Sequence, residues 1–181
     1  MSTSPAHLDP QRSAHLAWLH TLYLLLETTR REGLFGLEDI VLSPDGPGTP
    51  FSRFPLTREE PYRTLVCDFV QVVIEGAEGE SLRRYGAAAL WGLRHHGGDT
   101  LDESLLQTIW LTLEAGLVDR LPPRTACEFG RQALPWRQRP GYEALYDSLR
   151  ATPYRASDNE EGTPLELDER IERFIASLSE T

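Results

Sequence analysis

The chain has 181 residues, enough for one domain that buries about two-thirds of its unfolded surface. Its 40% apolar and 25% charged residues are typical of a folded globular protein, so disorder is not the default expectation. The net charge of −10 argues against a general binder of nucleic acid or anionic membranes, because both need a basic footprint. It is compatible with a basic protein partner and equally with a role in solubility alone.

The sequence predicts neither an N-terminal signal peptide nor a membrane span. The N-terminal sequence MSTSPAHLDPQRS lacks a basic region followed by an apolar stretch, so we do not expect a signal peptide. No window approaches the roughly 18 consecutive apolar residues of a membrane span. Cys67 and Cys127 lie in apolar helical patterns without metal-type spacing, which predicts buried, reduced thiols. The sequence therefore predicts a soluble, cytoplasmic protein.

The first predicted element is an amphipathic helix from Arg12 to about Arg31, with apolar side chains at steps of three and four. Gly33 interrupts it, and residues 34–42 are predicted to form one or two further helical turns. Residues 43–57 are rich in proline and glycine, which predicts a long loop that Phe51 and Phe54 pin to the core.

A helical hairpin is predicted next. Apolar residues from about Arg58 to Glu75 follow the helical period closely. A tight turn at residues 76–79 leads into a helix of matching length, from Glu80 to about Leu93.

Three further helices are predicted beyond this hairpin. Residues 95–99 read as a short linker, and residues 101–121 form one long helix with a broad apolar face. Pro122 and Pro123 end that helix and suit the first turn of the next one, at residues 124–134. A last helix of this group is expected at residues 141–151.

No stretch carries a strand signal or an internal repeat, so the predicted fold is all-α, a compact helical bundle built around the hairpin. We expect one domain over residues 1–151 and a flexible acidic linker over residues 152–164. A C-terminal amphipathic helix is predicted over residues 165–181. Its apolar side chains recur at helical spacing: Leu167, Ile171, Phe174, Ile175 and Leu178.

The sequence offers no sign of an active site. It contains no phosphate-binding glycine loop, nucleophile elbow or zinc-protease motif. His95 and His96 are adjacent, so both rings cannot face one metal ion from a helix, and a solvated linker is the simpler interpretation. We therefore expect no enzyme activity, no cofactor and no metal site.

Two long blocks resemble the cytoplasmic portions of the flagellar motor stator A subunit (MotA) family. The first contains LYLLLETTRREGLFGLEDIV, PFSRFP and CDFVQVVIEG, in the order in which the family uses them between its second and third membrane helices. The second runs from QTIWLTLEAGLVDRLPP to EFGRQALPWRQRPGYEALYDSLRA and resembles the tail after the fourth membrane helix. Together they cover about residues 16–151.

The four membrane helices of that family have no counterpart in this sequence. The resemblance therefore describes a chain that cannot conduct ions or generate torque by itself. It is either a natural membrane-free relative or a version of such a subunit from which the spans were removed.

The resemblance also implies a set of protein-binding residues. Arg30 and Glu38 match family positions that face complementary charges on the rotor switch protein FliG, and Asp68 matches a further charged position. Arg31 is included as the adjacent charge on the same bend. A purely structural interpretation stays open, because Arg30 could pair with Glu27 or Glu38. Arg31 has the favourable four-residue spacing from Glu27.

The expected function is therefore a soluble, stator-A-like domain that contacts rotor switch or stator components through a charged helical surface, as a monomer or weak dimer. The alternative is a helical adaptor or chaperone-like scaffold that serves another secretion or envelope machine.

Overall fold

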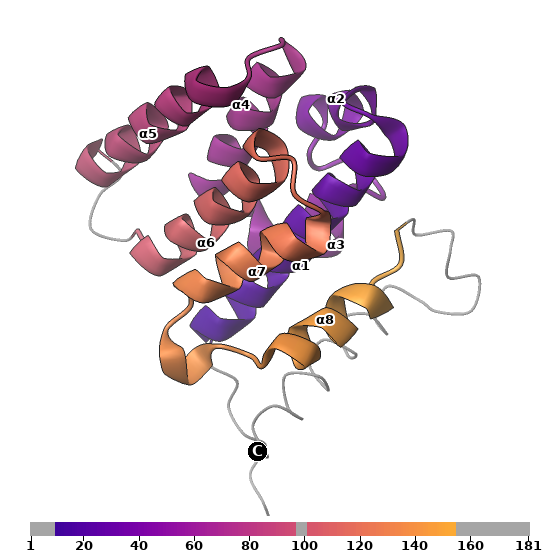
Figure 1. The fold of residues 1–181 in the computed structure, drawn as a ribbon, viewed down its shortest axis with the longest axis vertical. Helices are drawn as coiled ribbons and strands as arrows, with labels where there is room; N and C mark the ends of the chain where they lie inside the picture. Colours follow the sequence, from indigo (N-terminus) through magenta and orange to yellow (C-terminus); the bar gives the residue numbers. More distant parts are fainter. Residues whose placement is uncertain (1–9, 97–100, 155–181) are drawn as a thin grey trace, which may run out of the picture.

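The computed structural model describes residues 10–96 and 101–154 (Figure 1). These two ranges contain eight α-helices and no strand, which confirms the predicted all-α fold. In this part of the chain, no helix has both the length and the apolar character needed to cross a bilayer. The predicted C-terminal helix, residues 165–181, and most of the predicted linker before it lie outside the described residues.

Helix α1 (Pro10–Glu32) runs through the middle of the fold, with α6 and α7 beside it (Figure 1). Its apolar side chains occupy several faces rather than one stripe, so it must be covered on several sides. Trp18 is fully buried and meets Phe51 and Tyr62 edge-on, with ring centroids 6.1 and 6.4 Å apart. Leu16 and Leu19 belong to a second buried cluster, on the side where the C-terminal helices pack.

The predicted loop at residues 43–57 is wrong in its second half. After α2 (Phe35–Leu42), the chain forms the short helix α3 (Pro50–Arg53) and a 3-10 turn at Pro55–Arg58. Proline is tolerated at the first helical position because its missing N–H has no intrahelical partner there. The Thr49 side chain accepts a hydrogen bond from the Ser52 amide at 3.2 Å and caps α3. Phe51 and Phe54 are buried, as the sequence predicted.

Helices α4 (Tyr62–Ile74) and α5 (Gly79–His96) form the predicted hairpin. Helix α4 begins later than the predicted Arg58, because the residue before Pro61 is disfavoured in a helix. Helix α5 extends beyond the predicted end at Leu93. His95 hydrogen-bonds through Nδ1 to the Trp91 carbonyl at 2.8 Å and stacks on its ring. His95 and His96 therefore belong to the helix and not to the predicted linker.

The single helix predicted at residues 101–121 is in fact two elements. Helix α6 (Glu103–Leu113) is followed by one π-helical turn at Glu114–Val118, which we call the π-turn. The chain then turns at Arg120, whose φ of 56° is left-handed, and the Leu121 amide donates to the Ala115 carbonyl at 2.9 Å. A left-handed residue commonly ends a helix. The hydrogen bond around it spans one residue more than in the usual Schellman motif, because it closes a π-helical turn.

Helix α7 (Pro123–Ala133) lies against α6, and α8 (Tyr142–Ala151) lies beyond it (Figure 1). His20 of α1 is buried and bonds to the hydroxyls of Ser148 and Thr152, each at 2.7 Å. This pair of bonds fixes α8 to α1. Cys127 is buried and Cys67 is half-buried, and both are free thiols.

Candidate functional site

The bend between α1 and α2 carries most of the sequence-predicted binding residues. We call it the α1–α2 corner and define it as Arg30, Arg31, Leu34, Phe35 and Glu38. Helix α1 ends before Gly33, whose φ of 74° lets the chain turn where other residues would be strained. Leu37, fully buried, then anchors the first turn of α2 in the core. The corner is thus a local break between two helices, and the buried Leu37 side chain attaches it to the core.

Both arginines of the corner are held by the same carboxylate. Arg30 Nη2 donates to Glu27 Oε2 at 2.7 Å, and Arg31 Nε donates to the same oxygen at 3.2 Å. Burial alone would raise the pKa of Glu27, but the hydrogen bonds from Arg30 and Arg31 outweigh it, so the pKa lies below its usual value. The structure therefore selects Glu27, not Glu38, as the partner of Arg30. About half of each arginine side chain remains exposed.

Arg31 makes a second contact that the sequence did not predict. Its guanidinium lies 4.4 Å from the ring centroid of Tyr154, and the Tyr154 hydroxyl donates to Glu32 Oε1 at 2.8 Å. Tyr154 is the last residue that the structure describes. The two contacts place it at the end of α1, beside the corner, although 122 residues separate it from Glu32. No local sequence pattern could have indicated this.

Glu38 and Asp68 lie in different surroundings. Glu38 is half-buried in the first turn of α2, and Asp68 is exposed on α4. Neither forms an ion pair with another residue in the described part of the chain. Asp68 lies near Tyr85 of α5. Burial of Tyr85 raises its pKa, and the negative charge of Asp68 raises that pKa further. The structure thus brings Arg30, Arg31 and Glu38 to one corner, while Asp68 has no hydrogen bond or ion pair with them.

The corner also carries an exposed aromatic side chain. Phe35 is 82% exposed and follows Leu34, which is 37% exposed. Aromatic side chains and arginine are the groups that most often dominate protein interfaces. The sequence analysis placed Leu34 and Phe35 in the helical turns predicted over residues 34–42 and did not identify them as exposed.

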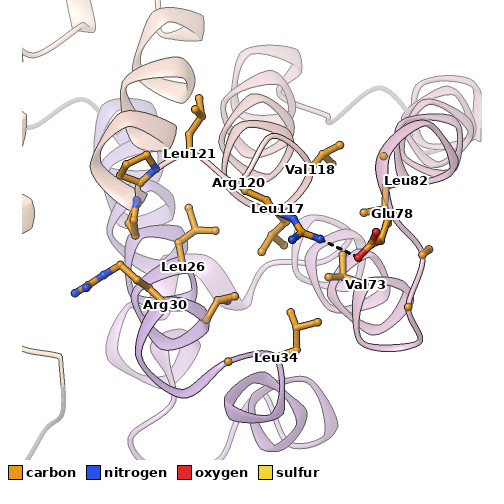
Figure 2. Close-up of a pocket in the computed structure, with 18 residues that line it drawn as sticks. Leu26, Arg30, Leu34, Val73, Glu78, Leu82, Leu117, Val118, Arg120 and Leu121 are labelled. Atoms are coloured by element: carbon orange, nitrogen blue, oxygen red, sulfur yellow. Dashed lines mark hydrogen bonds and ion pairs between the residues drawn. The ribbon is translucent and has the colours of Figure 1, made fainter.

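A groove opens beside the corner (Figure 2). It has a volume of about 540 Å³ and is mostly apolar. Three segments form its walls: the end of α1 with Leu34, the end of α4 with the following turn and the start of α5, and the π-turn with the residues that follow it. Figure 2 shows Leu26, Val73 and Leu117 converging from these three segments. Arg30 lines one side, so the groove and the corner share a border.

Side-chain contacts of the π-turn give the groove its shape. A Cβ at Gly116 would overlap the side chain of Leu26, so with Leu26 in this position glycine gives the π-turn the room to approach α1 this closely. Arg83 of α5 holds both Glu114, at 3.0 Å, and Asp119. Arg120 spans to Glu78 of the α4–α5 turn at 2.8 Å, the ion pair drawn in Figure 2. These contacts join the far wall of the groove to the hairpin.

Two buried or half-buried titratable groups, His20 and Cys67, lie away from the groove. Burial, followed by the charge of Arg53, lowers the pKa of His20 to about 4, and burial raises the pKa of Cys67 to about 11. Neither group lines the groove. Within the described ranges, no three His, Cys, Asp or Glu side chains are grouped so that they could hold a metal ion. The arrangement is suited to binding a protein surface through an aromatic residue, two cations and an apolar groove.

Comparisons with protein-family models, curated proteins and solved structures gave no match for this chain.

Proposed function

We propose that this protein is a stator-A-like binding domain that contacts a flagellar rotor switch protein through the α1–α2 corner. The observation that carries the proposal is Phe35, which is 82% exposed at the start of α2, a few residues after the two arginines that Glu27 holds in place. Exposed ion pairs each contribute only about 0–1 kcal/mol to binding. The charges of the corner would therefore guide the partner to it and fix how the partner is aligned, while burial of the Phe35 ring would supply most of the binding free energy. Glu38 adds the opposite charge one helical turn further on.

The partner's chemistry follows from these groups. A helix that presents carboxylates toward Arg30 and Arg31, a basic group toward Glu38, and an apolar recess for Phe35 would be complementary. The resemblance of residues 16–151 to the stator subunit supports the rotor switch protein as the source of such a helix. A free domain that occupies rotor sites would limit engagement of the membrane-bound stator, so its role would be competitive.

Affinity measurements with purified rotor switch protein test this proposal. We expect Arg30→Glu and Phe35→Ala each to weaken binding at least about tenfold, because a central interface residue contributes more than about 1.4 kcal/mol. Two matched controls lie elsewhere: Arg84→Glu, which reverses another exposed, ion-paired arginine, and Trp136→Ala, which removes an equally exposed aromatic ring. Both should bind as the wild type does.

Two outcomes would overturn the assignment. The first is a wild-type protein that shows no measurable affinity for the rotor switch protein. The second is an equal loss of affinity in the control variants. If the corner variants instead abolish binding to a component of a secretion or envelope machine, the adaptor alternative is the correct one. In cells, overproduction of the wild type should reduce motility, and Arg30→Glu should remove that effect.

A further inference from the structure

We propose that the groove beside the α1–α2 corner is the docking site for this chain's own C-terminal segment, residues 165–181. The groove is apolar and borders the corner, where the described chain stops at Tyr154. The inference concerns the groove itself. Only its regulatory consequence, given below, rests on the proposed function.

The place where the described chain stops supports this occupant. Tyr154 is fixed by Arg31 and Glu32, within three residues of Arg30 and Gly33, which line the groove. Helical spacing puts the Tyr154 contacts and the groove on different sides of α1, about one helix diameter or 10–12 Å apart. Residues 155–164 can span up to about 33 Å when extended. The connecting segment is therefore long enough to reach around the end of α1.

The apolar pattern of the segment fits the groove. A helix over residues 165–181 would be about 25 Å long and would carry one apolar stripe. The stripe has the same character as the leucine and valine walls of the groove. A cavity of about 540 Å³ lies within the range that accepts several bulky apolar groups. The side chains of the stripe are Leu167, Ile171, Phe174, Ile175 and Leu178.

The charges also agree. Residues 155–181 contain eight carboxylates and three arginines, so the segment is acidic. Asp168 and Glu172 are one helical turn apart and border the apolar stripe on one side. Three charged residues line the groove: Arg30, Glu78 and Arg120. Arg120 and Glu78 pair with each other, so Arg30 is the cation that an acidic segment would meet. Placing the acidic border of the segment beside Arg30 would set opposite charges together while the apolar stripe faces the groove walls.

Tethering makes such docking effective even when the contact itself is weak. A short flexible connection gives an intramolecular partner an effective concentration in the millimolar range. The segment then covers one flank of the corner, and a rotor protein would have to displace it. On the proposed function, residues 165–181 therefore act as an internal competitor that lowers affinity until the partner arrives.

Hydrogen exchange followed by mass spectrometry on the full chain tests the docking without any partner. We expect Phe174→Asp to accelerate exchange several-fold in the groove walls at residues 76–82 and 116–121. Leu34→Asp, on the groove side, should accelerate exchange several-fold in residues 165–181. The double variant should add little to either single variant, because both remove the same contact.

Ser177→Asp and Leu56→Asp are the controls, the first on the polar side of the segment and the second at a half-exposed leucine outside the groove. Both should exchange as the wild type does. The proposal is overturned if Phe174→Asp leaves the groove walls unchanged, or if the controls have the same effect. Protection that rises with protein concentration, with a doubled mass in light scattering, would assign the groove to a second copy instead. The effect of Arg30→Glu on affinity for the rotor switch protein is a separate measurement. It tests only the proposed function and not the docking of residues 165–181.

Discussion

At the residue scale, Glu27 is compatible with both a structural role and a binding role for the charges of the α1–α2 corner. Its carboxylate is 11% exposed and receives hydrogen bonds from Arg30 and Arg31. Such helix-surface pairs add only about 0.2–0.5 kcal/mol to stability, so their main effect here is orientation. About half of each arginine side chain is exposed while its guanidinium is held by Glu27. The structural pairing and the binding role are thus compatible.

Glycine at position 130 allows α7 to approach α6 closely. A Cβ there would overlap Thr112 Oγ1 and lie 2.8 Å from the Thr108 carbonyl oxygen. We expect Gly130→Ala to lower the free energy of unfolding by about 1–3 kcal/mol, because a backbone atom cannot move aside as a flexible side chain does. Denaturant unfolding followed by circular dichroism measures this change.

Gly92→Ala is the matched control for that substitution. Gly92 lies inside α5, and a Cβ there meets no heavy atom within 4 Å. Alanine should therefore raise the free energy of unfolding by up to about 1 kcal/mol, from helix propensity alone. If Gly130→Ala stabilised the protein as Gly92→Ala does, the close contact between α6 and α7 would not exist in solution.

At the scale of elements, α8 depends on one buried histidine. His20 bonds to Ser148 and Thr152, and its ring lies 5.6 Å from that of Phe54. Leu145 and Leu149 complete the attachment by packing in the cluster of Leu16 and Leu19. Because Tyr154 lies just beyond the C-cap of this helix, Thr152, the histidine also helps to determine where the C-terminal segment begins.

Stability should therefore fall in mild acid. Burial and the charge of Arg53 lower the pKa of His20 from 6.5 to about 4 in the folded protein. Between these values the unfolded chain binds more protons than the folded one, so the free energy of unfolding decreases as pH falls. The free energy of unfolding should fall by on the order of 3 kcal/mol between neutral pH and pH 4, and the decrease begins as the pH drops through 6.5. Chemical denaturation at several pH values measures the slope.

His20→Gln should flatten that slope above pH 5, because glutamine does not titrate. Glu27 and Glu128 do not obscure this window, since their pKa values are lowered from 4.5 and they act at more acidic pH. His96→Gln, at the exposed end of α5, serves as the control and should retain the wild-type slope. A wild-type slope in His20→Gln would contradict the buried, neutral histidine.

At the scale of the whole molecule, α1 connects the buried clusters that the described residues form. These residues form four separate apolar clusters, and α1 contributes a side chain to each: Trp18, Leu22 and Leu25 to the largest, and Leu16, Leu24 and Leu26 among the other three. If the helices that pack around any one cluster separated from α1, apolar side chains of α1 would become exposed to water. The described part of the chain should therefore unfold as one cooperative unit.

Leu22→Ala tests this coupling. Leu22 is fully buried, so we expect a loss of about 2–5 kcal/mol in the free energy of unfolding. Circular dichroism and tryptophan fluorescence should still report one coincident transition. Leu56→Ala, at a leucine that is 49% exposed, should cost less than about 1 kcal/mol. Two separated transitions in either variant would show that the clusters unfold independently.

The sequence alone determined the features that depend on neighbours in the chain. The helical class, the α4–α5 hairpin and the Glu27–Arg31 pair were predictable because side chains three and four residues apart share a helix face. The burial of Phe51 and Phe54 followed from apolar residues within a polar loop. The family resemblance and the partner that it implies stay predictions.

Only the tertiary structure decided the features that depend on distant residues. Helix α6 gives way to the π-turn where Gly116 meets Leu26 of α1, a contact that no periodicity within residues 101–121 records. The groove needs walls from three segments, and Tyr154 reaches Arg31 from the far end of the described chain. Helical periodicity is a local property of the chain. How closely two helices pack depends on which residues, often glycine, leave room between them.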